Sequence, residues 1–133
     1  MPPAVGSSAV LELQVASDPV VAAAGASFLV PVRLRNVSAE PVPLMFLSSC
    51  SFRVVIATED GRELARPEAF CLSVIREPTL EPGAVLEDSV AYTMGEPGVV
   101  PLAPGAYRVT PVLLSVNQHP VEVRSARLEV RRP

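Results

Sequence analysis

Proline limits the fold of this chain more than any other residue type. The sequence contains 15 prolines among its 133 residues, so one occurs about every nine residues. A proline inside a helix costs roughly 3 kcal/mol, because it lacks an amide hydrogen and its ring clashes with the preceding turn. This spacing argues against a helical bundle, whereas loops and strand edges tolerate proline. Valine dominates the apolar residues between the prolines and favours strands, so the sequence predicts an all-β protein.

The composition is that of one folded domain. Hydrophobic residues make up 49% of the chain, charged residues 19%, and the mean hydropathy is positive, which is unlike a disordered chain. We expect residues 9–133 to form a single domain after a flexible tail at residues 1–8, which has no basic and no apolar region of a signal peptide. Pro, Gly, Arg or Glu interrupts each apolar stretch within about ten residues, so we predict no membrane insertion.

Alternation of apolar and polar residues places the first strands. It predicts one strand at residues 9–16 and a second at 28–35, where Pro31 should lie at a sheet edge or direct its missing amide hydrogen outward. A turn at 36–41 predicts a hairpin with the short run 42–47. Asp60 and Gly61 form a strong hairpin signal between residues 52–56 and 62–66.

The second half of the chain continues the same pattern. Two Leu-X-Pro-Gly turns frame one strand, another strand starts near Tyr107, and the last runs from Val121 to Val130 with a β-bulge near Arg124 and Ser125. Seven or eight such strands predict an immunoglobulin-like antiparallel β-sandwich. Tyr107 follows a tight turn, which is the place of a tyrosine corner, although an ordinary inward-facing Tyr is the alternative.

Several short motifs occur in an order that is similar to a known family. They are Leu34-Arg35-Asn36-Val37-Ser38 with Pro41-Val42, Leu44-Met45-Phe46, Ser48-Ser49-Cys50-Ser51-Phe52-Arg53-Val54, Asp60-Gly61-Arg62, Phe70-Cys71, Thr79-Leu80-Glu81-Pro82-Gly83 and Pro104-Gly105-Ala106-Tyr107-Arg108-Val109. From about Phe28 to Leu114 the chain resembles the bacterial intracellular proteinase inhibitor family, the BsuPI-like domains. The resemblance implies an immunoglobulin-like β-sandwich that inhibits a protease. Paired cysteines at similar places look like those of exported relatives.

Cys50 and Cys71 lie about equally far from the Asp60-Gly61 turn, one on each side. An antiparallel return of the chain would bring them within the roughly 4.4 to 6.8 Å between Cα atoms that a disulfide needs. The alternative is two buried free thiols in a reducing compartment. A disulfide would place the protein in the periplasm or at the cell surface, and free thiols would place it in the cytoplasm.

The sequence contains no recognisable catalytic or metal-binding pattern. Its single histidine, His119, lies in a polar turn, and two cysteines with one distant histidine lack metal-ligand spacing. We therefore predict no enzyme activity, no cofactor and no metal site. Arg124, Arg127, Arg131 and Arg132 make the last strand basic, but without interleaved aromatic residues we predict no nucleic-acid binding. Asn36 begins a glycosylation sequon, although Asn at a strand end is more simply a turn former.

Two loops are the candidate partner-binding surface. The first comprises residues 65–73. The second, residues 94–104, is long, stiffened by prolines and apolar, and such a loop loses little entropy on binding. Packing of the second loop onto its own end of the sandwich is the alternative. The candidate contact residues are Arg66, Phe70, Arg76, Val99, Val100 and Leu102. The leading hypothesis is a non-enzymatic protein-binding or structural module of bacterial origin. The alternative is a BsuPI-type inhibitor of a serine protease, with Arg66 or Arg76 as the residue that enters the protease.

Overall fold

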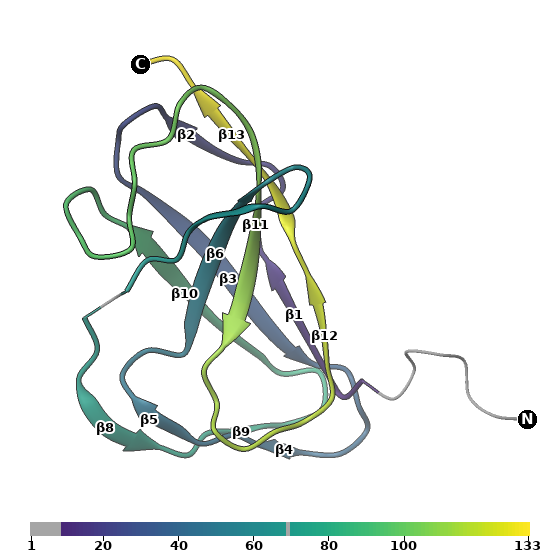
Figure 1. Ribbon diagram of the computed structural model, residues 1–133. Coiled ribbons are helices and arrows are strands. Elements are labelled where there is room, and N and C mark those ends of the chain that lie inside the picture. The colour runs from purple at the N-terminus through teal and green to yellow at the C-terminus, as the bar shows by residue number, and fades with distance from the viewer. Residues whose placement is uncertain (1–8, 69) are drawn as a thin grey trace, which may run out of the picture.

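The computed structural model describes residues 9–68 and 70–133, which form thirteen β-strands and no helix (Figure 1). The strands are β1 (Leu11–Val15), β2 (Val20–Ala23), β3 (Phe28–Asn36), β4 (Val42–Pro43), β5 (Phe46–Ser48), β6 (Phe52–Thr58), β7 (Glu63–Ala65), β8 (Ser73–Arg76), β9 (Thr79–Leu80), β10 (Val85–Tyr92), β11 (Gly105–Leu113), β12 (Val121–Arg124) and β13 (Ala126–Arg131). The predicted all-β class is therefore confirmed. None of the described residues form a helix long and apolar enough to cross a membrane.

Two sheets build the domain and enclose its core. One has the strand order β10-β3-β1-β12 and the other β2-β13-β11-β6-β7. Inward-facing residues of both sheets, such as Leu13, Val32, Ile56 and Leu128, are at most 1% exposed. Two short ribbons, β4-β9 and β5-β8, lie together at one end of the molecule (Figure 1). The strand period of two thus produces one apolar face on each sheet, and these faces pack together.

The strand pairing corrects three predictions. The sandwich is not entirely antiparallel, because β1 pairs with β12 and β2 pairs with β13 in parallel. Residues 42–47 do not form a hairpin with β3, since β4 pairs with β9 and β5 pairs with β8. The last strand has no bulge near Arg124 and Ser125; the chain there passes from the four-stranded sheet into the five-stranded sheet. The described residues form thirteen strands in place of seven or eight, largely because short strands such as β4, β5, β8 and β9 pair in separate two-stranded ribbons.

Pro31 lies in an internal strand, so its predicted edge position is wrong. β3 is flanked by β10 and β1. The Ala16 amide donates to the Pro31 carbonyl at 2.8 Å, one residue beyond the last pair of β1, Val15 with Val32. The missing amide hydrogen of Pro31 would therefore have faced the Ala16 carbonyl, one residue past the end of β1. Proline is tolerated here because the shorter neighbouring strand has already ended.

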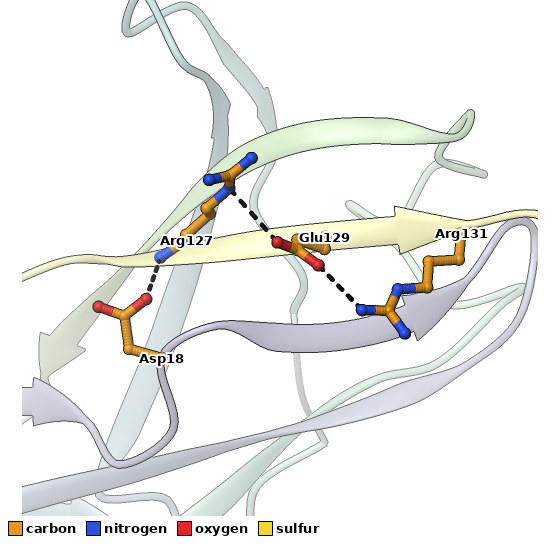
Figure 2. A network of polar contacts seen from close by, with 4 residues as sticks. All are labelled: Asp18, Arg127, Glu129 and Arg131. Atoms are coloured by element: carbon orange, nitrogen blue, oxygen red, sulfur yellow. Dashed lines mark hydrogen bonds and ion pairs between the residues drawn. The ribbon is translucent and has the colours of Figure 1, made fainter.

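The small residues after β1 form a strand that the sequence pattern did not predict. Asp18 Oδ1 accepts the backbone N–H of Arg127 at 3.1 Å and fixes the start of β2 beside β13 (Figure 2). On β13, Glu129 forms ion pairs with Arg127 at 3.7 Å and Arg131 at 3.1 Å. The basic C-terminal strand thus carries its own carboxylate, which offsets part of its positive charge.

Candidate functional site

The sulfur atoms of Cys50 and Cys71 are joined, and their Cα atoms lie 5.6 Å apart. The hairpin between them is β6-β7, closed by a Thr58 amide that donates to the Arg62 carbonyl at 2.9 Å. The predicted disulfide and the predicted Asp-Gly hairpin are both confirmed. The covalent bond ties the segment before β6 to the segment before β8.

Beside the disulfide lies an exposed group of large apolar side chains, which we call the apolar ribbon. It consists of Leu47 on β5, Val74 and Ile75 on β8, and Phe70 and Leu72 on the segment leading into β8. Phe70 is 86% exposed, Ile75 68% and Leu72 60%. Leu72 is held at its backbone, because it donates to Ser49 Oγ and accepts the Ser49 amide, both at 2.9 Å. A fixed backbone therefore presents these apolar side chains to solvent.

The Arg76 side chain turns away from this exposed surface. Its guanidinium carbon lies 4.5 Å from the centre of the Phe46 ring, which is fully buried. Arg76 Nε donates to the Ser48 carbonyl at 2.9 Å, and Nη2 donates to Ser51 Oγ at 3.1 Å. The cation–π contact and the two hydrogen bonds join β8 to β5 and to the start of β6. Arg76 therefore holds β8 against β5 and β6, which is a different role from the predicted partner contact.

A groove of about 220 Å³ opens next to Phe70. It lies between the start of β6 and the edge strand β10, and its lining residues are Ser49, Cys50, Ser51, Phe52, Phe70, Asp88, Ser89, Val90 and Ala91. The disulfide and the most exposed apolar side chain of the ribbon therefore share one concave surface.

The loop 65–73 contacts the loop 94–104 through its backbone. The Arg66 amide donates to the Gly98 carbonyl and the Glu68 amide to the Pro97 carbonyl, each at 3.1 Å. The Arg66 side chain remains exposed and forms an ion pair with Glu63 at 2.8 Å, and this hydrogen bond lowers the pKa of Glu63. The two predicted loops thus form one connected surface, joined by backbone hydrogen bonds directly after β7.

The second loop packs largely onto its own end of the sandwich. Leu102 is only 6% exposed and Val99 packs against the core, whereas Val100 is 41% exposed. Leu102 is therefore a core residue, because contact with a partner would require it to leave the buried cluster. Of the three apolar residues predicted in this loop, Val100 lies nearest to the solvent.

Two other residues from the sequence prediction have defined surroundings. The Tyr107 hydroxyl donates to the Ala103 carbonyl at 2.6 Å, across the turn that precedes β11. His119 Nε2 lies 2.7 Å from the Pro43 carbonyl, to which Asn117 Nδ2 also donates, at 2.8 Å. These contacts hold the loop after β11 against β4. Residues 9–68 and 70–133 contain no group of three or more His, Cys, Asp or Glu side chains placed to hold a metal ion.

The sequence analysis missed Leu47, Val74, Ile75 and Asp88. The sequence did contain a signal for Val74 and Ile75. Together with Leu72 they occupy three of four consecutive positions, which departs from the alternation of a half-buried strand. No such signal marks Asp88. Its place in the groove depends on the approach of β10 to β6, two strands that belong to different sheets.

Comparisons with known proteins give a likeness of fold. Neither the known protein families nor the curated proteins include a match to this chain, so the resemblance to BsuPI-like domains stays a prediction. Among solved structures, the CARDB domain of a Pyrococcus furiosus protein, in complex with di-metal ions, is similar over 92% of this chain and 94% of that chain. It has a TM-score of 0.52 and 16% sequence identity.

Two longer proteins contain a region of related shape. A DNA glycosylase from Pseudomonas fluorescens matches 92% of this chain with a TM-score of 0.48 and 16% identity, and a β-glucosidase from Listeria innocua matches 90% with a TM-score of 0.47 and 18% identity. This chain spans 31% and 16% of their lengths, respectively. The all-β architecture and the likeness to the CARDB domain show that the chain has an immunoglobulin-like β-sandwich fold.

Proposed function

We propose that this domain is a non-enzymatic protein-binding module whose contact surface is the apolar ribbon. The observation that carries the proposal is the exposure of Phe70, Leu72 and Ile75 on one disulfide-anchored segment. Large aromatic and aliphatic side chains exposed along one short segment are more typical of protein interfaces than single scattered ones.

The support beneath the ribbon favours binding. The disulfide, the Ser49–Leu72 hydrogen bonds and the Arg76–Phe46 contact fix the backbone before any partner arrives. A surface ordered in advance loses little conformational entropy on association, so more of the apolar burial contributes to affinity.

A location outside the cytoplasm accompanies this proposal. Structural disulfides form and persist in oxidising compartments, and the Cys50–Cys71 bond spans the base of the proposed surface. In a reducing compartment the segment that carries Phe70 would lose its covalent anchor. The binding module is therefore best suited to the periplasm or the cell surface.

The test compares two surface variants, each of which replaces an exposed aliphatic side chain by serine. Ile75→Ser removes an apolar side chain from the ribbon, and Val123→Ser removes one that is 47% exposed on β12, at the sheet edge opposite β10. Both should keep the unfolding midpoint, since each side chain is exposed. Each variant is immobilised and exposed to an extracytoplasmic extract. The Val123→Ser variant should capture the same partner as the parent domain, and the Ile75→Ser variant should not. Equal capture by both variants would contradict the proposal.

The second candidate function is inhibition of a serine protease, and one observation favours it. Phe70 projects into solvent directly before a disulfide cysteine, as a rigid side chain that a protease cleft could accept. Arg66 is a poorer candidate because it is followed by Pro67 and paired with Glu63, and Arg76 is turned onto Phe46. We expect any inhibition to fall on proteases that prefer aromatic residues. A titration of a chymotrypsin-like and a trypsin-like protease with the domain tests this. Full activity of both proteases at micromolar concentrations of the domain would eliminate the inhibitor function.

A further inference from the structure

The groove beside Phe70 runs along an unpaired sheet edge. β10 is the outermost strand of its sheet, and its eight residues pair with β3 without a shift in register. The Pro31 carbonyl accepts the Ala16 amide and therefore faces β1. Ser89 lies opposite Pro31 on β10, so the amide and carbonyl of Ser89 point away from β3. By alternation, the amide and carbonyl of Ala91 also point outward. Both residues line the groove.

The groove also contains a carboxylate without a cationic partner. Asp88 Oδ1 accepts the Ser89 amide at 2.8 Å, and Asp88 forms no ion pair within residues 9–68 and 70–133. The neighbouring Glu87 differs, because its carboxylate lies 3.5 Å from Arg33. Asp88 therefore retains an unpaired negative charge where the two sheets meet the solvent.

Two of the three serine hydroxyls that line the groove are already engaged. Ser49 Oγ accepts the Leu72 amide, and Ser51 Oγ accepts Arg76 Nη2. The groups that remain available include the Asp88 carboxylate, the aromatic face of Phe70 and the outward backbone groups of Ala91. A carboxylate and an aromatic ring together favour a cation, and a free strand edge favours an extended chain.

We propose that the groove binds an extended segment of a partner protein through an arginine or lysine side chain. The backbone of the segment would pair with the outer edge of β10 at Ala91, and its cationic group would lie between the Asp88 carboxylate and the Phe70 ring. Arginine suits the site better than lysine, because its planar group forms two parallel hydrogen bonds with a carboxylate and stacks on an aromatic ring. This inference rests on the proposed function and adds the chemistry of the partner.

The decisive experiment uses a display library of random octapeptides as the probe. Peptides are selected on the intact, oxidised domain and measured by fluorescence anisotropy against two variants. Asp88→Asn keeps an oxygen for the Ser89 amide but removes the free charge, whereas Glu87→Gln removes a charge of the same sign one residue away. We expect peptides with an arginine or lysine at a constant position, a dissociation constant raised about tenfold by Asp88→Asn, and less than a twofold change with Glu87→Gln.

Amide hydrogen exchange provides the second measurement. The outward Ala91 amide should exchange quickly in the free domain and slowly in the complex, whereas the Val90 amide, which pairs with β3, should be protected in both states. Peptides without a basic residue, equal affinity for Asp88→Asn and the parent domain, or an unchanged Ala91 amide would each overturn the inference. So would self-association of the domain through this groove, seen as a dimer that Asp88→Asn dissolves.

The two proposals fail in different ways. If the natural partner is lost with Ile75→Ser and retained with Asp88→Asn, the apolar ribbon binds the partner and the groove does not. If no partner depends on either residue, the protein-binding function itself is wrong.

Discussion

The hydroxyl group of Tyr92 makes two hydrogen bonds with the backbone of one residue, Val100. It donates to the Val100 carbonyl at 2.6 Å and accepts the Val100 amide at 3.1 Å. The ring is fully buried and stacks on Phe28, with ring centres 4.8 Å apart. One side chain at the end of β10 thus fixes the 94–104 loop against the core. The same loop accepts the backbone hydrogen bonds of Arg66 and Glu68.

Replacement of Tyr92 by Phe should weaken this attachment. Loss of both hydrogen bonds should lower the free energy of unfolding by about 1–3 kcal/mol at pH 7, measured by urea denaturation. Burial also raises the pKa of the Tyr92 hydroxyl above its ordinary value of about 10. The folded state then holds this proton more tightly than the unfolded state, so the associated stability is present below pH 10 and declines as the pH rises through the raised pKa.

The loss of stability at alkaline pH provides a control for the role of Tyr92. The parent domain should lose stability above about pH 10, and Tyr92→Phe should lose less over the same range. Tyr107→Phe removes a single hydrogen bond, to the Ala103 carbonyl, and should leave most of the alkaline decline in place, because burial is the first cause of the raised pKa of Tyr92. An identical alkaline decline in the parent and in Tyr92→Phe would contradict the role of Tyr92.

Asn36 should be one of the least replaceable polar residues. It is fully buried, its Nδ2 group donates to the Glu40 and Leu80 carbonyls at 2.7 and 2.8 Å, and its Oδ1 accepts the Ser38 amide at 2.9 Å. Asp at this position would bury a charge and could not donate to the Glu40 and Leu80 carbonyls, so Asn36→Asp should cost about 3 kcal/mol or more.

Ser38→Ala provides the comparison for Asn36. It removes a half-exposed hydroxyl but keeps the Ser38 amide bond to Asn36, so we expect a loss of about 1 kcal/mol. Calorimetry should give a clearly lower unfolding midpoint for Asn36→Asp than for Ser38→Ala. The burial of Asn36 also argues against its use as a glycosylation site, and an attached glycan detected by mass spectrometry would contradict this arrangement.

Reduction of the disulfide should destabilise the domain. The two cysteines are separated by 21 positions, for which the loss of chain entropy in the unfolded state predicts about 3 kcal/mol. The unfolding midpoint should fall by roughly 10 °C, in calorimetry with and without reductant. Non-reducing mass spectrometry should show no alkylated thiol in the parent domain. Two alkylatable thiols and an unchanged midpoint would contradict the disulfide and the proposed oxidising location.

Arg76→Met should loosen the apolar ribbon while it retains much of the side-chain volume. The variant loses the contact with the Phe46 ring and both hydrogen bonds, and it leaves the buried Ser51 hydroxyl without its donor. We expect a loss of about 1–3 kcal/mol and faster amide exchange in β8. Arg62→Met, at an exposed turn position, should change stability by less than about 0.5 kcal/mol. Equal effects of the two variants would show that Arg76 does not support the ribbon.

Much of the fold could be predicted from local patterns in the sequence. Alternation placed β1, β3, β6 and β11, and the Asp60-Gly61 turn fixed the β6-β7 hairpin because adjacent strands and a tight turn are local features. The disulfide was predictable for the same reason, since a hairpin brings positions equally distant from its turn together. The exposed position of Phe70 followed from its place in a predicted loop.

The tertiary structure decided the order of strands and the position of the groove. The sequence pattern around Arg124 and Ser125 indicates a change of phase, but only the packing of two sheets determines that the chain passes from one to the other there. The parallel β2-β13 pair and the partners of β4 and β5 join residues far apart in the chain. Local periodicity fixes which face of a strand is buried, whereas the choice of neighbour depends on how all strands together cover the core. Asp88 and Phe70 come together in the groove only through that arrangement.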